Sequence, residues 1–100
     1  MDSETVRKPA EKPAQSVAFG RALYMLRMQR DLSQEELSFR SRIDRSYLSQ
    51  IERGEKEPCL RVIFKLSKAL EMSPSALFQE VEKMLGSQEP QSSTRKRRVR

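Results

Sequence analysis

The sequence predicts an all-α fold of five helices, and three observations support that prediction. Apolar residues recur at spacings of three and four in five separate segments, which is the pattern of one helix face. Residues that favour helix starts, namely Ser33, Asp44 and the pair Ser73 and Pro74, precede three of these segments. No segment alternates apolar and polar residues as a half-buried strand does.

Residues 1–15 precede the first periodic segment. They combine two prolines and six charges with few apolar side chains, so we expect a flexible N-terminal arm. The folded domain should begin at Ser16, with a first helix over residues 17–30. The residues that share one face of this helix are Phe19, Leu23, Leu26 and Arg30.

The second helix is expected over residues 34–41. Ser33 and Glu36 have the spacing of a capping box, in which each side chain accepts a hydrogen bond from the other residue's backbone N–H. Leu32 and Leu37 should point inward. Ser38 is small enough to pack closely if its hydroxyl bonds to a carbonyl one turn earlier.

The third helix is expected over residues 45–53, after a short turn. Ile43 should plug the turn, and Asp44 is a suitable N-cap because its carboxylate accepts hydrogen bonds from free backbone N–H groups. Leu48 and Ile51 should be buried. Gly54 supplies the left-handed residue that commonly ends a helix.

Two further helices complete a domain over residues 16–86. The fourth, over residues 60–71, should lie at the centre of the core, and its apolar face comprises Leu60, Ile63, Leu66, Ala69 and Leu70. The fifth should run from Pro74 to Leu85 and stop at Gly86. Residues 87–100 are polar, with five bases and one acid, which predicts a disordered basic tail.

Composition excludes several classes of function. The chain has no histidine and one cysteine, which argues against an enzyme with a histidine base, a disulfide, and the usual zinc sites. We therefore expect no catalysis, no metal and no cofactor. One hundred residues leave no room for a domain that senses a small-molecule ligand. No membrane span or signal peptide is indicated, so we expect a cytoplasmic protein.

The second and third helices have the spacing of a helix-turn-helix. The turn between them is short, and the third helix carries short polar side chains in its N-terminal half. Such a unit places its second helix in the major groove of DNA while the first crosses the backbone.

Several blocks of sequence resemble the lambda-repressor and Cro-like (XRE-type) helix-turn-helix family. They are LSQEEL at 32–37, IDRSYLSQIERGEKEP at 43–58, LSKAL at 66–70 and SPSALF at 73–78. The resemblance runs without a gap over residues 19–78. It implies a lambda-repressor-like DNA-binding domain that binds double-stranded DNA.

The resemblance also implies roles for individual residues. Those expected to face base edges are Arg45, Ser46, Ser49 and Gln50. Those expected at the DNA backbone are Gln34 and Tyr47, to which the charges of Arg42, Arg53 and Lys56 can be added. The residue types suit these roles, because arginine pairs with guanine, glutamine with adenine, and serine with either.

The resemblance further implies a structural contact between Arg27 and Glu52, which would tie the first helix to the third. Two positions depart from the family pattern, because Asp31 and Arg42 stand where glycine is usual. A left-handed backbone there costs a non-glycine residue roughly 1 kcal/mol.

The apolar stripe of the fifth helix has two possible roles. It could simply close the core, or it could form the interface of a homodimer, as is frequent in this family. The residues concerned are Leu77, Phe78, Val81, Met84 and Leu85.

The function implied is that of a transcriptional regulator, most simply a repressor that binds an inverted-repeat operator as a homodimer. One alternative is a small controller-type activator, with Glu52, Glu55 and Glu57 as candidates for contact with RNA polymerase. Another is an antitoxin or interaction module that binds a partner protein. Two points stay open: whether the basic tail contacts DNA or only aids solubility, and whether Cys59 is a redox switch or a small apolar residue.

Overall fold

A computed structural model describes residues 12–88 of the chain, and it contains five helices. They are α1 (Ala14–Gln29), α2 (Gln34–Ser41), α3 (Arg45–Glu52), α4 (Leu60–Ala69) and α5 (Pro74–Gln88). No strand occurs within the described part, and the predicted all-α fold is confirmed. No helix there is long and apolar enough to cross a bilayer.

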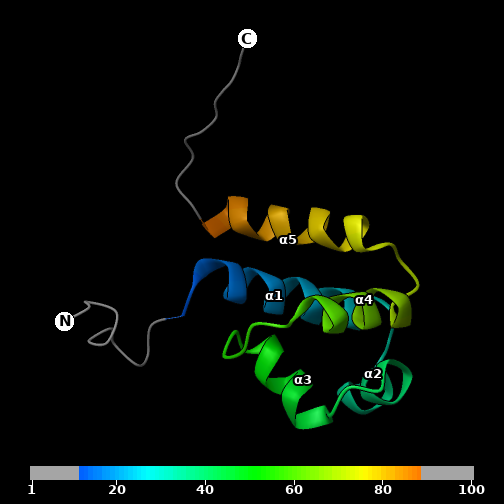
Figure 1. Cartoon of the computed structure of the whole chain (residues 1–100). Helices are drawn as coiled ribbons and strands as arrows, with labels where there is room; N and C mark the ends of the chain where they lie inside the picture. The colour runs from blue at the N-terminus through cyan, green and yellow to red at the C-terminus, as the bar shows by residue number, and fades with distance from the viewer. Residues whose placement is uncertain (1–11, 89–100) are drawn as a thin grey trace, which may run out of the picture.

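The centre of the domain is α1, not α4 as the sequence suggested. α1 packs against α5 on one side and α3 on the other, whereas α4 contacts α2 and α5 (Figure 1). Leu60, predicted to be inward, is 68% exposed because the first turn of α4 projects beyond the core. The fully buried leucine and isoleucine side chains come from all five helices: Leu23, Leu37, Leu48, Ile51, Leu66, Leu70 and Leu77.

Three helix boundaries differ by two residues or more from those predicted. α1 begins at Ala14, inside the expected arm, with Pro13 at the N-cap position and its carbonyl accepting from the N–H of Val17. α4 ends at Ala69 and leaves Glu71 in a left-handed conformation. α5 continues through Gly86 to Gln88, because a glycine stops a helix only where the backbone turns left-handed. Most of the expected arm and tail lies outside the described residues.

Close contact between α1 and α3 depends on Gly20. A Cβ atom at this position would overlap the backbone carbonyl oxygens of Ile51 and Glu52. Ala18 and Ala22, two residues to either side, are fully buried. Gly54, which follows α3 with φ at 75°, lies against the backbone of Val17. Small residues therefore let α3 lie directly on α1.

Replacement of Gly20 by alanine should destabilise the fold. Backbone carbonyls cannot move aside as a flexible side chain can, so we expect the free energy of unfolding to fall by roughly 1–3 kcal/mol. The matched control is Gly86→Ala in α5, where an added Cβ meets no atom within 4 Å. That variant should be neutral or slightly more stable. Urea denaturation followed by circular dichroism measures both, and equal stability of the two variants would contradict the close contact.

Candidate nucleic-acid interface

Hydrogen bonds define both the start of α2 and the turn that joins α2 to α3. The capping box of α2 is present, with Glu36 N–H donating to Ser33 Oγ and Ser33 N–H to Glu36 Oε1. Arg42 adopts φ of 62°, the left-handed conformation that its position in the turn predicted. Ser38 Oγ donates forward to the carbonyl of Ile43, not back to the preceding turn as expected. This bond closes the turn.

Asp44 caps α3 and also engages a candidate base-reading residue. Its carboxylate accepts from the N–H groups of Ser46 and Tyr47 and, at 2.8 Å, from the Ser46 hydroxyl. The Ser46 hydroxyl and then the Tyr47 N–H hold the pKa of Asp44 below its usual value. In the free protein the Ser46 hydroxyl therefore uses its one hydrogen in the bond to Asp44. Only its lone pairs remain, so it can accept a hydrogen bond from a further partner.

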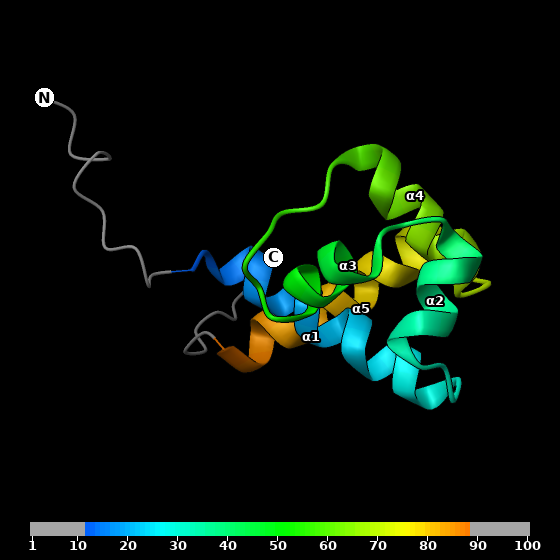
Figure 2. The ribbon, with the colours of Figure 1, turned by 90° about the horizontal axis from the view of Figure 1, so that it is seen from below.

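The four residues expected to face bases lie together on the exposed side of α3. Figure 2 shows α2 and α3 from below, the side on which both helices face the viewer. A shallow hollow of about 310 Å³ brings the α3 residues together with the first residue of α2. Its lining is formed by Gln34, Arg45, Ser46, Ser49, Gln50 and Arg53. The sequence predicted every one of these residues.

A buried ion pair fixes α3 to α1 beneath this hollow. Arg27 Nε lies 2.6 Å from Glu52 Oε2 and Arg27 Nη2 lies 2.9 Å from Oε1. Their side chains are only 8% and 5% exposed. The Glu52 carboxylate is the main cause of the raised pKa of Arg27. Gln34 Nε2 also donates to Glu52 Oε1 at 2.9 Å, so the pair orients the start of α2 as well.

The acidic residues proposed for RNA polymerase do not form a free patch. Glu52 is buried in the ion pair, so its assignment to a polymerase contact is wrong. Glu55 pairs with Arg53 at 3.0 Å, and Glu57 accepts the Ser16 hydroxyl at 3.3 Å. Arg53 also donates to Ser49 Oγ. Arg53 and Ser49 therefore already have hydrogen-bond partners in the free protein.

The remaining candidates lie outside the hollow on α3. Tyr47 is half-buried against the core, and its hydroxyl points to the carbonyl of Glu57 at 3.5 Å. Lys56 is exposed in the loop before α4. Arg42 lines a different hollow, between α2 and α4. Cys59 is exposed at the start of α4, where the Val62 N–H lowers the pKa of its thiol.

The apolar stripe of α5 divides between both roles that the sequence left open. Leu77 and Val81 are buried in the core of the protomer itself. This corrects the assignment of Leu77 to a dimer interface, because a side chain with no exposed surface cannot face a second copy. Val81 belongs to the core and also lines a groove beside α5. Phe78 is 41% exposed, and Met84 and Leu85 are half-buried. These three residues provide most of the exposed surface of the stripe.

Removal of the Glu52 carboxylate should be far more harmful than removal of an exposed one. Glu52→Ala leaves Arg27 buried without a counter-charge, which typically costs about 3–5 kcal/mol. Glu55→Ala is the matched control, since it removes the same charge from an exposed pair and should change stability little. Thermal unfolding of both variants tests this. Similar midpoints would show that the buried pair does not tie α1 to α3.

Comparison with known proteins places the fold in a family. A model of the helix-turn-helix family matches residues 23–77. The chain is 38% identical over 68 residues to the control protein C.MunI of a Mycoplasma species, covering 67% of this chain and 92% of that one. It is 40% identical over 61 residues to the control protein C.BamHI of Bacillus amyloliquefaciens, covering 60% and 75%.

A solved structure gives the same result. The restriction-modification controller protein C.AhdI of Aeromonas hydrophila superposes with a TM-score of 0.64 and 45% identity, over 66% of this chain and all of that one. The family model covers more than half of the chain, including the turn and both helices that flank it. The chain therefore belongs to the helix-turn-helix family, in the XRE-type group that its sequence blocks resemble.

Proposed function

We propose that this protein is a sequence-specific DNA-binding transcriptional regulator that acts as a homodimer. The observation that carries the proposal is the hollow on α3, where Arg45, Ser49 and Gln50 are gathered beside the start of α2. These side chains are held on a helix that is fixed from below by a buried ion pair. A rigid helix that offers donors and acceptors along one exposed face suits the major groove.

Arg45 and Gln50 are the residues that we expect to select bases. A guanidinium can donate two hydrogen bonds to guanine O6 and N7, and a carboxamide can pair with adenine N6 and N7. Ser46 and Ser49 would add contacts to either base. Phosphate contacts would come from Gln34, Arg42, Tyr47, Arg53 and Lys56, which set the register of the protein on the duplex without reading sequence.

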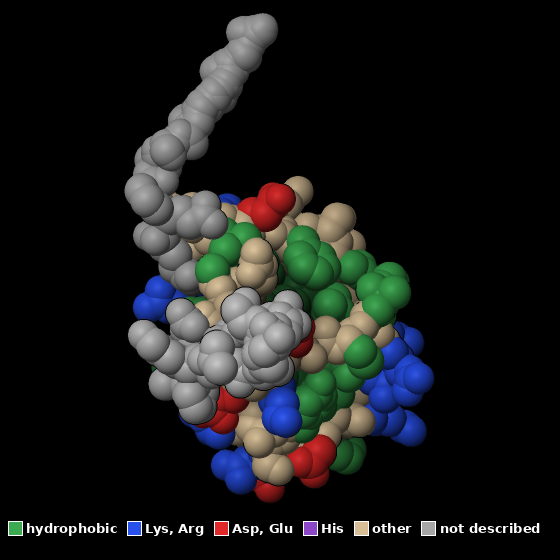
Figure 3. Space-filling model, turned by 60° about the vertical axis from the view of Figure 1, so that its left-hand side comes forward, with side chains coloured by type: hydrophobic (Ala, Val, Ile, Leu, Met, Phe, Trp, Pro, Cys, Tyr) green, Lys and Arg blue, Asp and Glu red, His purple; other side chains and the backbone are tan. Residues whose placement is uncertain are grey.

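The homodimer is proposed to form through the surface of α5. An apolar groove of about 510 Å³ runs beside this helix, lined by Phe19, Ile63, Phe78 and Leu85 among others. Figure 3 shows hydrophobic side chains gathered on the side where α1 begins and α5 ends. A two-fold dimer through this surface would present two α3 helices to half-sites about one helical turn apart. The operator should then be an inverted repeat.

Repression by blocking polymerase is the simplest mode of action, because it needs nothing beyond occupancy of the operator. The similarity to control proteins favours a second candidate function, that of a controller of restriction-modification genes. In that role the protein could activate transcription as well as repress it. In either case we expect the protein to perform no chemistry and to work in the cytoplasm. Activation would require a polymerase contact from residues other than Glu52.

Sequence selection should depend on Arg45 and Gln50. We expect wild-type protein to recover an inverted repeat from sheared genomic DNA, and Arg45→Ala/Gln50→Ala to lose that preference by more than tenfold. Each bidentate base contact discriminates by about 1–3 kcal/mol. Arg21→Ala/Gln29→Ala is the matched control, since it removes the same residue types from exposed positions of α1. Sequence-blind recovery by the wild type would contradict the proposed function.

Dimerisation should depend on Phe78. A charge at this position would be buried between two copies, so Phe78→Glu should sediment as a folded monomer. Its apparent operator affinity should fall roughly 100-fold, because the second half-site no longer gains from binding of the first. Gln79→Glu adds the same charge at the neighbouring exposed position and should stay dimeric. A Phe78→Glu variant that remains dimeric would exclude this interface.

A further inference from the structure

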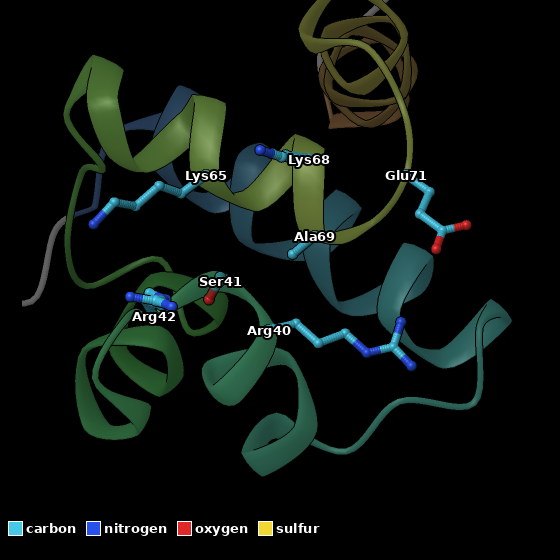
Figure 4. A pocket seen from close by; sticks show the side chains of 7 residues that line it. All are labelled: Arg40, Ser41, Arg42, Lys65, Lys68, Ala69 and Glu71. Atoms are coloured by element: carbon cyan, nitrogen blue, oxygen red, sulfur yellow. The ribbon is translucent and has the colours of Figure 1, made fainter.

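A second hollow, separate from the one on α3, lies between the C-terminal end of α2 and α4. Its volume is about 510 Å³, and it is lined by Arg40, Ser41, Arg42, Lys65, Lys68, Ala69 and Glu71. It shares no residue with the hollow on α3. Figure 4 shows Arg42 and Lys65 on one side of it and Arg40 and Glu71 on the other. α2 and α4 supply five of these residues, and Arg42 and Glu71 lie in the segments that follow the two helices.

The lining carries four cations and one carboxylate. Arg40, Arg42, Lys65 and Lys68 are all exposed. None of the four belongs to an ion pair or to a side-chain hydrogen bond within residues 12–88. By contrast, the nearby cations Arg27, Arg30 and Arg53 all bind acceptors of the protein. Arg40 has Glu36, one turn earlier on α2, as a charged neighbour, and Glu71 lines the hollow. The lining still keeps an excess of positive charge, which a bound anion would reduce.

The backbone of Arg42 adds a further sign. Its left-handed φ of 62° would suit glycine better, so the turn retains a strained arginine whose charge faces the hollow. Strain held at one residue is a reason to look for a role of its side chain. Glu71, also left-handed, lines the same hollow. Asp31 also has a left-handed backbone, but it lies outside this hollow. The cluster of charges therefore supports a binding site here more strongly than the backbone strain does.

We propose that this basic hollow binds the sugar-phosphate backbone of duplex DNA beyond the bases that α3 reads. The inference rests on the proposed function, because it assigns an additional contact of the same DNA. Arg42 precedes Arg45 by three residues, so the hollow begins next to the N-terminal end of α3. One guanidinium group can donate two parallel hydrogen bonds to a phosphate, and a lysine adds a point charge.

The lining favours a phosphate backbone over an acidic protein. Ala69 is the only apolar side chain in the hollow, whereas protein interfaces depend on aromatic and aliphatic anchors that fill pockets. A duplex carries one negative charge for every 1.7 Å or so of its axis. It therefore offers several phosphates to a cluster of cations without requiring an apolar contact.

The salt dependence of DNA binding tests the inference. The probe is a mixed-sequence duplex of about four helical turns, and the variant is Arg40→Gln/Lys65→Gln in the full chain. Each phosphate contact contributes about 0.9 to the slope of log affinity against log salt. The magnitude of this negative slope should therefore decrease by about 1.8, and affinity at low salt should fall more than tenfold.

The control is Arg21→Gln/Lys83→Gln, which lowers the net charge equally on α1 and α5. Its slope should stay close to that of the wild type. An unchanged slope for Arg40→Gln/Lys65→Gln, with tight binding by the wild type, overturns this inference and leaves the proposed function standing. Equal losses in both variants also overturn it, because they would show only an effect of net charge. Failure of the wild type to bind DNA would overturn both.

Arg42→Gly gives a test that loss of folding cannot imitate. Glycine relieves the left-handed strain, so the variant should unfold at a higher temperature than the wild type. Its affinity for the same duplex should nevertheless fall, by roughly tenfold at low salt. A more stable protein with unchanged DNA affinity would remove Arg42 from the proposed site.

Discussion

The buried ion pair between Arg27 and Glu52 is the interaction on which the proposed DNA-binding surface depends. It joins the last turn of α1 to the last residue of α3, and its carboxylate also accepts from Gln34 at the first residue of α2. Arg27 donates in addition to the carbonyl of Leu32. Three helices and a loop therefore meet at one ion pair. Such a pair adds little net stability but strongly disfavours other arrangements, because either charge alone would be buried unpaired.

The ion pair acts together with the steric fit at Gly20. A glycine facing the carbonyls of Ile51 and Glu52 lets α3 approach α1 more closely than any larger residue would. The inward side of α3 is thereby committed to Leu48 and Ile51, and its outward side is left to polar residues. Several outward side chains already bind one another, as Arg53 binds Ser49 and Ser46 binds Asp44. These hydrogen bonds order the side chains before DNA binds, which lowers the entropy cost of binding. DNA would have to replace them with hydrogen bonds of its own.

Cations line two separate hollows on the described surface. On α3 the cations stand among neutral hydrogen-bonding residues, which suits the reading of bases. Between α2 and α4 four cations line one hollow, which suits phosphates. The apolar surface of α5 lies apart from both hollows. One small domain can in this way keep base selection, backbone attraction and self-association on different faces.

The sequence by itself determined the five helices, the capping box at Ser33, the cap at Asp44 and the residues of the α3 hollow. The helices and caps follow from local spacing and from residue types whose preferences are local, whereas the residues of the α3 hollow were implied by the family resemblance. Only the tertiary structure decided that α1 is the centre of the core, that Leu60 is exposed, and that Leu77 and Val81 are internal. It also decided that Glu52 is unavailable to a partner, and that Arg40, Arg42, Lys65 and Lys68 meet. Periodicity shows which side of a helix is apolar, but only packing decides what covers that side and which distant charges become neighbours.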